Sequence, residues 1–225
     1  MEVQFARMKT RTARIVKRQY VALIGDIVKS RGLSPARRRA AQKQFTVLMK
    51  HLNRKYAKNV LAKFVITLGD EFQAILSDPI IISDLIWDIQ KEFPYPVRLG
   101  FGYGILTTAV PDYAINVDGP ALHSARAAME RARKGKILGG VFVGFGESLD
   151  GVLGGIARLL EFHRQTRSEQ QLKIVDLLRV GKTQLEIAKQ FRVTKQAISG
   201  QARAAGWDAY REGEGAMRLV LEQVA

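Results

Sequence analysis

The chain has 225 residues, is 47% hydrophobic and carries a formal net charge of +15, which is typical of a globular protein with one full core and room for a small second module. No apolar run approaches the roughly 20 residues that span a bilayer, no secretory signal is recognisable, and the lack of cysteine excludes disulfides and thiolate metal sites, which fits a cytoplasmic protein. The positive charge predicts a polyanionic partner, most often nucleic acid, with solubility alone as the other explanation.

The N-terminal part of the chain begins with a basic arm over residues 1–18, which shows little periodicity. Residues 20–25 are an apolar run that predicts a buried strand ending directly on Asp26. A Ser-Pro pair then suits the N-cap and first turn of a helix over residues 34–56, whose apolar residues recur on one face. We therefore expect a strand followed by an amphipathic helix.

The segment between Asp26 and Asp70 has no acidic residue, whereas lysine and arginine recur throughout it. A surface of one sign attracts phosphate groups, so this segment is a candidate contact for a triphosphate or for a nucleic-acid backbone. The alternative is an ordinary solvated helix face. Either interpretation places cationic residues next to Asp26.

A β-hairpin is predicted over residues 62–77, because two apolar runs flank Gly69-Asp70 and these residues tolerate the backbone angles of a tight turn. The hairpin sets Asp70 at a strand tip. Since Asp26 ends a neighbouring predicted strand, the two aspartates form a candidate site for a divalent metal ion. Their alternative roles are those of a strand cap and a turn residue.

The following elements are separated by proline and glycine. A helix with apolar residues at helical spacing begins at Pro79, and a strand interrupted by glycines follows over residues 97–108. These glycines admit either a ligand or a packed neighbour close to the backbone. A loop over residues 109–117, a helix over 119–133 and a short strand over 139–145 complete a mixed sheet with helices on one face, an α+β architecture.

Four segments occur in the same order as in class III nucleotidyl cyclases and their palm-domain relatives: YVALIGDIVKSR, the GDEFQ hairpin, RLGFGYG and GPALHSARAAM. LGDEF also differs by one residue from the GGDEF hairpin of diguanylate cyclases. Over residues 20–146 the chain resembles the SatD-like family, whose members are similar to these palm domains. The resemblance implies a ferredoxin-like, nucleotidyl cyclase-like palm domain over residues 19–146, with a nucleoside triphosphate or cyclic nucleotide as its ligand.

The resemblance also implies roles for individual residues. Asp26 and Asp70 would hold Mg²⁺, which polarises a triphosphate for attack by a hydroxyl group. Arg126 corresponds to the cyclase arginine that stabilises transition-state charge, although a surface arginine on a helix is an equal alternative. The remaining implied contacts are a metal-binding carbonyl of Ile27, assistance from Glu71, and phosphate-binding amides of Val28, Lys29 and Ser30.

Two positions depart from the cyclase pattern. The asparagine that orients the ribose is replaced by Leu122 or His123, depending on the alignment, and the lysine that selects adenine is replaced by Ile66. These replacements speak against cyclase activity and leave the base preference open.

The last third of the chain is predicted to be helical. Residues 147–167 suit a connecting helix, and residues 168–225 suit a small all-α domain with the spacing of a helix-turn-helix. Thr194 suits the N-cap of the second helix of this motif. The helix crossing and the shared core are assigned to Ala188, Ile187, Val193 and Ile198. This part resembles TrfB-type repressors and sigma-factor region 4.

The second helix of such a motif enters the major groove of double-stranded DNA, so residues 194–205 are the candidate recognition helix. The candidate DNA-binding residues are Lys182, Lys189, Thr194, Lys195, Gln196, Ser199 and Arg203. The alternative is a helical hairpin used in dimer packing. The amphipathic C-terminal tail could also support a homodimer.

We therefore expect a DNA-binding transcriptional regulator whose palm domain binds a nucleotide or acts as an assembly platform, because the DNA-binding pattern is intact while the catalytic pattern lacks two residues. The alternative is a Mg²⁺-dependent nucleotidyl cyclase or nucleotidyltransferase. A third, weaker hypothesis is a structural nucleic-acid binder without a ligand.

Overall fold

The computed structural model of the chain describes residues 18–28, 32 and 34–225. The predicted basic arm, apart from Arg18, lies outside these residues. Within the described part, no helix is both long enough and apolar enough to cross a membrane. The cytoplasmic location stays a prediction.

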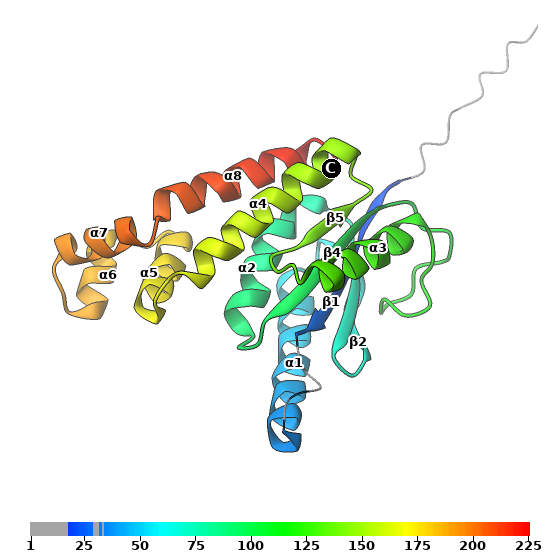
Figure 1. The fold of residues 1–225 in the computed structure, drawn as a ribbon, viewed down its shortest axis with the longest axis horizontal. Helices are drawn as coiled ribbons and strands as arrows, with labels where there is room; N and C mark the ends of the chain where they lie inside the picture. The colour runs from blue at the N-terminus through cyan, green and yellow to red at the C-terminus, as the bar shows by residue number, and fades with distance from the viewer. Residues whose placement is uncertain (1–17, 29–31, 33) are drawn as a thin grey trace, which may run out of the picture.

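The centre of the protein is a five-stranded sheet with the strand order β2-β3-β1-β4-β5 (Figure 1). All neighbouring strands are antiparallel except β4 and β5. The elements up to β4 follow the β-α-β-β-α-β order of a ferredoxin-like unit, and the predicted α+β architecture is confirmed. The strands are β1 (Tyr20–Ile27), β2 (Val60–Leu68), β3 (Glu71–Leu76), β4 (Val97–Gly104) and β5 (Val141–Val143).

The helices occupy nearly the positions that the sequence predicts. Ser34 caps the first helix by accepting a hydrogen bond from the amide of Arg37, and Pro79 opens a short 3₁₀ turn that leads into the second. The helices are α1 (Pro35–Lys55), η2 (Pro79–Ile81), α2 (Ile82–Glu92), α3 (Pro120–Gly135), α4 (Glu147–Gln165), α5 (Glu169–Arg179), α6 (Gln184–Phe191), α7 (Lys195–Ala204) and α8 (Trp207–Glu222).

These helices cover both faces of the sheet, so the prediction that they lie on one face is wrong. Side chains alternate along β1, because successive residues of a strand point to opposite faces. Val21 and Leu23 pack into a core with α1 and α2, whereas Ala22 and Ile24 pack against α3. The sheet therefore has a larger core on one side and a smaller core under α3 on the other.

The glycines of β4 let α3 approach the sheet closely. A Cβ atom on Gly102 would lie 2.1 Å from the backbone nitrogen of Ala125, and one on Gly100 would lie 2.6 Å from that of Met129. These distances leave no room for a side chain. Of the two roles considered for these glycines, close packing is therefore the one that the structure supports.

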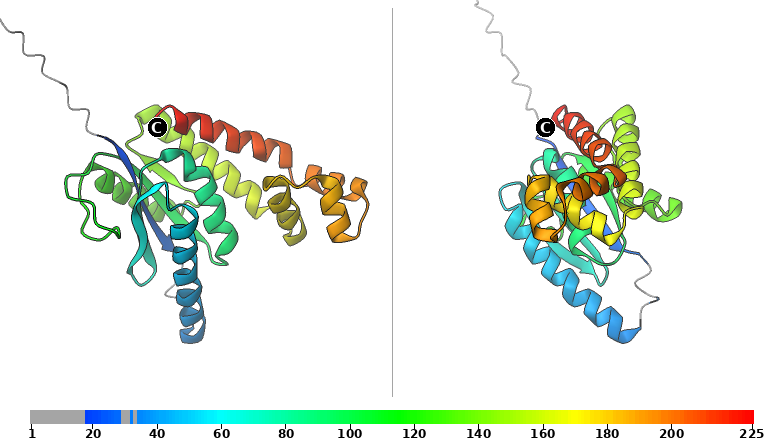
Figure 2. Two further views of the ribbon diagram at one scale, coloured as in Figure 1. Left: turned by 180° about the vertical axis from the view of Figure 1, so that it is seen from behind. Right: turned by 90° about the vertical axis from the view of Figure 1, so that its left-hand side faces the viewer.

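The C-terminal helices are packed against the sheet domain. The ring of Trp87 in α2 lies 5.5 Å from that of Tyr210 in α8, and the guanidinium of Arg179 in α5 lies over the same tryptophan. Met217 and Leu221 of α8 are fully buried in the larger core. Figure 2 shows α8 running beside α4 on the outside of this assembly. Met217 and Leu221 of the C-terminal tail are thus used within the chain, whereas Leu219 is exposed.

Candidate functional site

Three charged residues lie side by side on the face of the sheet that α3 covers. In the strand register Asp26 of β1 is directly opposite Glu71 of β3 and Arg98 of β4, and directly opposite residues share one face of a sheet. Asp26 is only 7% exposed, and the Nη1 atom of Arg98 lies 3.4 Å from its Oδ2 atom. The buried carboxylate is thus balanced by a cation on the neighbouring strand.

Arg133, close to the end of α3, joins the two carboxylates. Its Nε atom lies 2.8 Å from Oδ2 of Asp26, and its Nη2 atom lies 2.7 Å from Oε2 of Glu71. Burial acts to lower the pKa of Arg133, but the hydrogen bonds to Asp26 and Glu71 outweigh it and hold the pKa above its usual value. The guanidinium therefore stays charged, and its forked shape matches two carboxylates at once.

A cavity of about 490 Å³ opens beside this cluster. Arg126 and Arg133 both line it, and because they are seven residues apart on α3 they share one face of that helix. The side-chain amide of Gln73 donates a hydrogen bond to the carbonyl of Ala114 at the wall of the cavity. The other lining residues are Ile24, Thr67, Glu71, Ile115, Asn116, Met129 and Glu130. We call this space the α3 cavity.

The predicted hairpin turn is present, and in the strand register the acidic residue directly opposite Asp26 is Glu71, whereas Asp70 lies in the turn before it. Gly69 adopts a φ of 60° between β2 and β3. The carbonyl of Asp70, which follows it in the turn, accepts a hydrogen bond from the amide of Ile27 over 3.1 Å. The strand register then places the next residue, Glu71, opposite Asp26. Glu71, predicted as an assisting residue, therefore shares a sheet face with Asp26, and a metal site formed by Asp26 and Asp70 stays a prediction.

Of the predicted phosphate-binding amides, the structure describes that of Val28, which donates a hydrogen bond to the carbonyl of Pro96 over 2.9 Å. This donor is therefore used within the protein. Lys29 and Ser30, which complete the predicted set, lie outside the described residues. The metal-binding role of the Ile27 carbonyl stays a prediction.

The side chains, as arranged, do not fit the predicted Mg²⁺ site. Both oxygens of Asp26 lie within 3.5 Å of Arg98, and Oδ2 also accepts the hydrogen bond from Arg133. Two guanidinium groups at such distances repel a divalent cation, and Mg²⁺ prefers several oxygen ligands. Among the described residues, no group of three or more His, Cys, Asp or Glu is placed to hold a metal ion. In this arrangement arginine supplies the charge that the prediction assigned to Mg²⁺.

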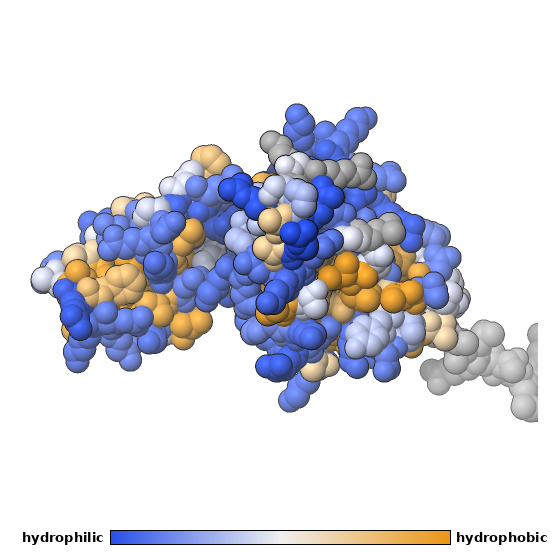
Figure 3. Space-filling view, turned by 90° about the horizontal axis from the view of Figure 1, so that it is seen from below, coloured by the Kyte–Doolittle hydropathy of each residue, from blue (hydrophilic) through white to orange (hydrophobic). Residues whose placement is uncertain are grey.

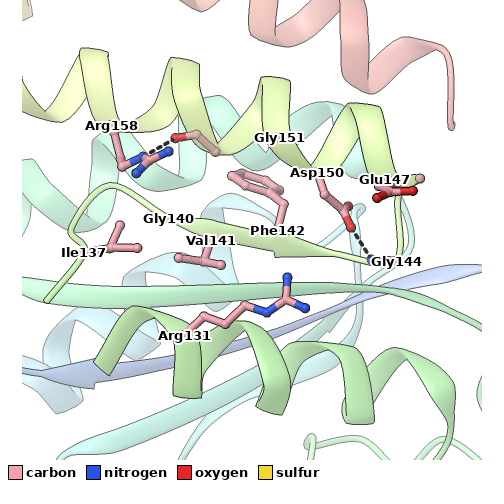
Figure 4. A pocket seen from close by; sticks show the side chains of 12 residues that line it. Arg131, Ile137, Gly140, Val141, Phe142, Gly144, Glu147, Asp150, Gly151 and Arg158 are labelled. Atoms are coloured by element: carbon pink, nitrogen blue, oxygen red, sulfur yellow. Dashed lines mark hydrogen bonds between the residues drawn. The ribbon is translucent and has the colours of Figure 1, made fainter. Parts of the chain in front are cut away.

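A second cavity, of about 610 Å³, lies at the β5 edge of the sheet (Figure 4). Arg131 of α3 and Arg158 of α4 point toward it from opposite sides. Asp150 closes one end by accepting hydrogen bonds from the amides of Gly144 and Phe145, over 3.0 and 2.9 Å. None of the predicted site residues lines this cavity, so the α3 cavity is the better candidate.

The helices α5, α6 and α7 enclose a small core of their own. Ile187, Ala188 and Ile198 are buried in it, as predicted, whereas Val193 is 42% exposed and is not part of it. Val193 lies in the three-residue turn between α6 and α7, where Arg192 is left-handed, so its side chain is turned outward. The hydroxyl of Thr194 accepts a hydrogen bond from the amide of Ala197, which confirms the predicted N-cap.

The predicted DNA-binding residues lie on the surface of this helical unit. All of them are exposed except Ser199, which is half-buried: Lys182, Lys189, Thr194, Lys195, Gln196 and Arg203. Lys182 also contacts Gln190 over 3.3 Å. Exposure satisfies a necessary condition for contact with DNA, and DNA binding itself stays a prediction.

Arg98 and Arg133, the two arginines that pair with Asp26, are absent from the predicted set of site residues. Arg98 is in phase with the residues of β4 that face α3, and Arg133 follows Arg126 by two helical turns. Both signals were present in the sequence. They were not decisive, because pairing with Asp26 depends on a strand register that the sequence does not reveal.

The family model described as the SatD family matches residues 20–212. The crystal structure of the catalytic core of a rhodopsin-guanylyl cyclase with converted specificity, in complex with ATPαS, is 13% identical, with a TM-score of 0.36 over 49% of this chain and 71% of that chain. A dimeric guanylyl cyclase domain of the RhoGC fusion protein from the aquatic fungus Blastocladiella emersonii is 16% identical, with a TM-score of 0.37 over 49% and 72%. No curated protein matches the chain significantly.

Proposed function

The chain belongs to the SatD family, and we propose that it is a nucleotide-binding protein whose α3 cavity takes a nucleoside phosphate. The observation that carries this proposal is the composition of the cavity wall. Arg126 supplies a cation from α3, Arg133 lies on the same face of the helix but is paired with Asp26 and Glu71, and Ile24, Ile115 and Met129 supply apolar surface. A nucleoside phosphate combines an anionic group with a flat, largely apolar base. A volume of about 490 Å³ also falls within the range of small-molecule sites, about 300–1,000 Å³.

Calorimetric titration with ATP and GTP, with and without Mg²⁺, tests the proposal. The informative variant is Arg126→Ala, and the matched control is Arg131→Ala, which removes an exposed arginine of the same helix that faces the other cavity. We expect Arg126→Ala to weaken binding about tenfold to a hundredfold, because a hydrogen bond to a charged group contributes about 1.5–3 kcal/mol. The absence of binding to the wild type, or an equal loss in both variants, would contradict the proposal.

Nucleotidyl cyclase activity would be the catalytic form of this function. The carboxylates of Asp26 and Glu71 beside the α3 cavity favour it, but Arg133 would first have to leave both of them. Product analysis after incubation with the four nucleoside triphosphates and Mg²⁺ or Mn²⁺ decides between an enzyme and a binding protein. A product formed by the wild type and not by Asp26→Asn supports the enzyme. Nucleotide binding without any product supports a binding protein.

DNA binding through α7 is the second candidate function. The observation that favours it is the division of α7 into two faces, with Ile198 and Ala202 buried and Lys195, Gln196 and Arg203 exposed. In this arrangement glutamine suits adenine, and arginine suits guanine. This surface would give the nucleotide-binding unit a role in transcription regulation, with double-stranded DNA as its partner.

Selection of binding sites from a random duplex pool, followed by gel-shift titration at fixed salt, tests this second function. We expect the double variant Gln196→Ala and Arg203→Ala to lose sequence preference, since each base contact contributes about 1–3 kcal/mol. Lys173→Ala, an exposed change on α5, serves as the control. An unchanged affinity for the selected site in the double variant would exclude α7 as the recognition helix.

A further inference from the structure

The helix α1 has one buried side and one strongly cationic side. Its 21 residues include no aspartate or glutamate. Ala41, Phe45, Leu48, Met49 and Leu52 are buried, whereas Arg39, Lys43, Lys50 and Arg54 are all exposed. Along the sequence these four cations are separated by four, seven and four residues. At 3.6 residues per turn they therefore lie within an arc of about 60° around the helix, opposite its buried side. We call these four residues the α1 stripe.

No acidic residue neutralises the α1 stripe within the described part of the chain. Two acidic residues of α2 pair with residues of α1 outside the stripe: Asp88 with Lys55 over 2.6 Å, and Glu92 with His51 over 3.2 Å. None of the four stripe side chains forms an ion pair with a described residue. Their charges therefore face solvent without a counterion from any residue that the structure describes.

The α1 stripe is straight and accessible. It runs over sixteen residues, from Arg39 to Arg54, and the fifteen steps of 1.5 Å between them give a length of about 22 Å. Figure 1 shows the first half of α1 extending beyond the sheet, and every residue from 34 to 40 is exposed. Figure 3 views the molecule from the side toward which α1 extends, and the surface around the protruding helix is largely hydrophilic. Because all four of its side chains are exposed, a large, extended partner can contact the stripe.

We propose that the α1 stripe binds the phosphate backbone of double-stranded DNA without reading its sequence. A small anion cannot contact all four cations, because Lys43 and Lys50 alone are separated by about 10 Å along the helix axis. A duplex presents about one negative charge per 1.7 Å of its axis, so a rod-like polyanion meets the whole stripe at once. The net charge of +15 favours the same partner. The inference requires neither the α3 cavity nor base contacts from α7.

The test compares two quadruple variants of the full chain that have the same net charge. The first replaces the α1 stripe with glutamine: R39Q, K43Q, K50Q and R54Q. The second, R131Q, K134Q, R158Q and K173Q, removes four exposed cations of α3, α4 and α5 that also lack an ion pair among the described residues. Glutamine is a good helix former, so both variants should fold, and circular dichroism checks this. Fluorescence anisotropy with a mixed-sequence duplex measures affinity as a function of salt.

Each phosphate contact contributes about 0.9 to the slope of log affinity against log salt. We therefore expect the slope of the stripe variant to be shallower than that of the wild type by up to about 3.6. Between about 50 and 200 mM salt the affinity of the wild type should fall about a hundredfold more than that of the stripe variant. The slope of the control variant should differ from that of the wild type by no more than about 0.9, the contribution of one phosphate contact.

Three outcomes would overturn the inference: no duplex binding by the wild type, equal slopes for the two quadruple variants, or tighter stripe-dependent binding to vesicles that contain phosphatidylserine than to the duplex. Failure of the α1 stripe as a DNA contact is distinguishable from failure of α7 as the recognition helix. The stripe is tested by the salt dependence of the affinity for non-selected DNA, whereas α7 is tested by sequence preference. The test of the stripe is also independent of nucleotide binding in the α3 cavity.

Discussion

The Nε atom of Arg133 donates a hydrogen bond to Oδ2 of Asp26 over 2.8 Å, and this bond links the end of α3 to the carboxylate in the middle of the sheet. The same guanidinium contacts Glu71. Arg133 therefore occupies the side of the two carboxylates that faces the α3 cavity. Any cation that approaches them from the cavity competes with this arginine.

Removal of Arg133 should create affinity for divalent cations. In Arg133→Ala the carboxylates of Asp26 and Glu71 are left with Arg98 as their remaining cation, so their charge is less fully balanced. We expect calorimetry with Mn²⁺ to show binding to Arg133→Ala and no binding to the wild type. Lys134→Ala, an exposed change one residue along, controls for the loss of positive charge. Binding of Mn²⁺ by the wild type that disappears in Asp26→Asn would show that Arg133 does not block the site.

Loss of the Asp26 charge should destabilise the fold. Asp26→Asn leaves Arg98 on the sheet without its carboxylate, and the Nε atom of Arg98 already lacks a hydrogen-bond partner among described residues. Breaking a buried ion pair on one side costs about 3–5 kcal/mol, so the free energy of unfolding in urea should fall by about 3 kcal/mol. Glu71→Gln should cost less than about 1 kcal/mol, because its one ion pair among the described residues is with the half-exposed Arg133. Equal losses for the two variants would contradict this account.

The local elements could be predicted from the sequence because each depends on neighbouring residues. The Ser34 cap, the turn at Gly69 and the apolar face of α1 all follow from patterns within a few positions, and all are present. The exception is Val193, whose apolar character suggested a core position although it lies in a turn. Apolar character alone does not decide burial where the backbone turns outward.

The site could be predicted only in part, because it depends on contacts between distant segments. The sequence predicts Asp26 and Arg126 as site residues and Glu71 as an assisting one, but the position of Glu71 directly opposite Asp26 follows from the β1–β3 register. The position of α3 on the opposite face of the sheet follows from the close approach at Gly102. This placement in turn brings Arg133 to Asp26. Register and close approach are tertiary properties, and no local pattern encodes either of them.

A methyl group at Gly102 should be incompatible with the position of α3. The Cβ atom of Gly102→Ala would lie 2.1 Å from the nitrogen of Ala125 and 2.2 Å from the carbonyl oxygen of Ala121. Both are backbone atoms, so the helix itself must move. Overpacking typically costs about 1–3 kcal/mol, and we expect at least the upper end of this range in thermal unfolding. Because α3 carries Arg126 and Arg133, nucleotide binding should weaken as well.

The control for this variant is Gly155→Ala in α4. A Cβ atom there has no neighbour within 4 Å, and alanine favours a helix interior over glycine by about 1 kcal/mol. The control should therefore be neutral or more stable than the wild type. If Gly102→Ala behaved in the same way, α3 would not be held on β4 by the close approach of the two backbones.

The attachment of the C-terminal helices should depend on Trp87. This side chain is 4% exposed, packs edge-on against Tyr210, and lies under the guanidinium of Arg179. Arg179 in turn pairs with Asp84 over 2.6 Å and with Glu214 over 2.9 Å. Trp87→Ala therefore removes the contact around which α2, α5 and α8 meet, and truncation of a buried aromatic residue costs about 3–5 kcal/mol.

Hydrogen exchange provides the readout for Trp87→Ala, because it resolves the two parts of the chain. We expect faster exchange in α5 to α8 with little change in β1 and β3. Trp207→Ala is the matched control, since Trp207 is only partly buried at the rim of the same cluster. Uniformly faster exchange along the chain would mean that sheet and helices unfold as one unit. Unchanged exchange in α5 to α8 would mean that the ion pairs of Arg179 suffice to hold them.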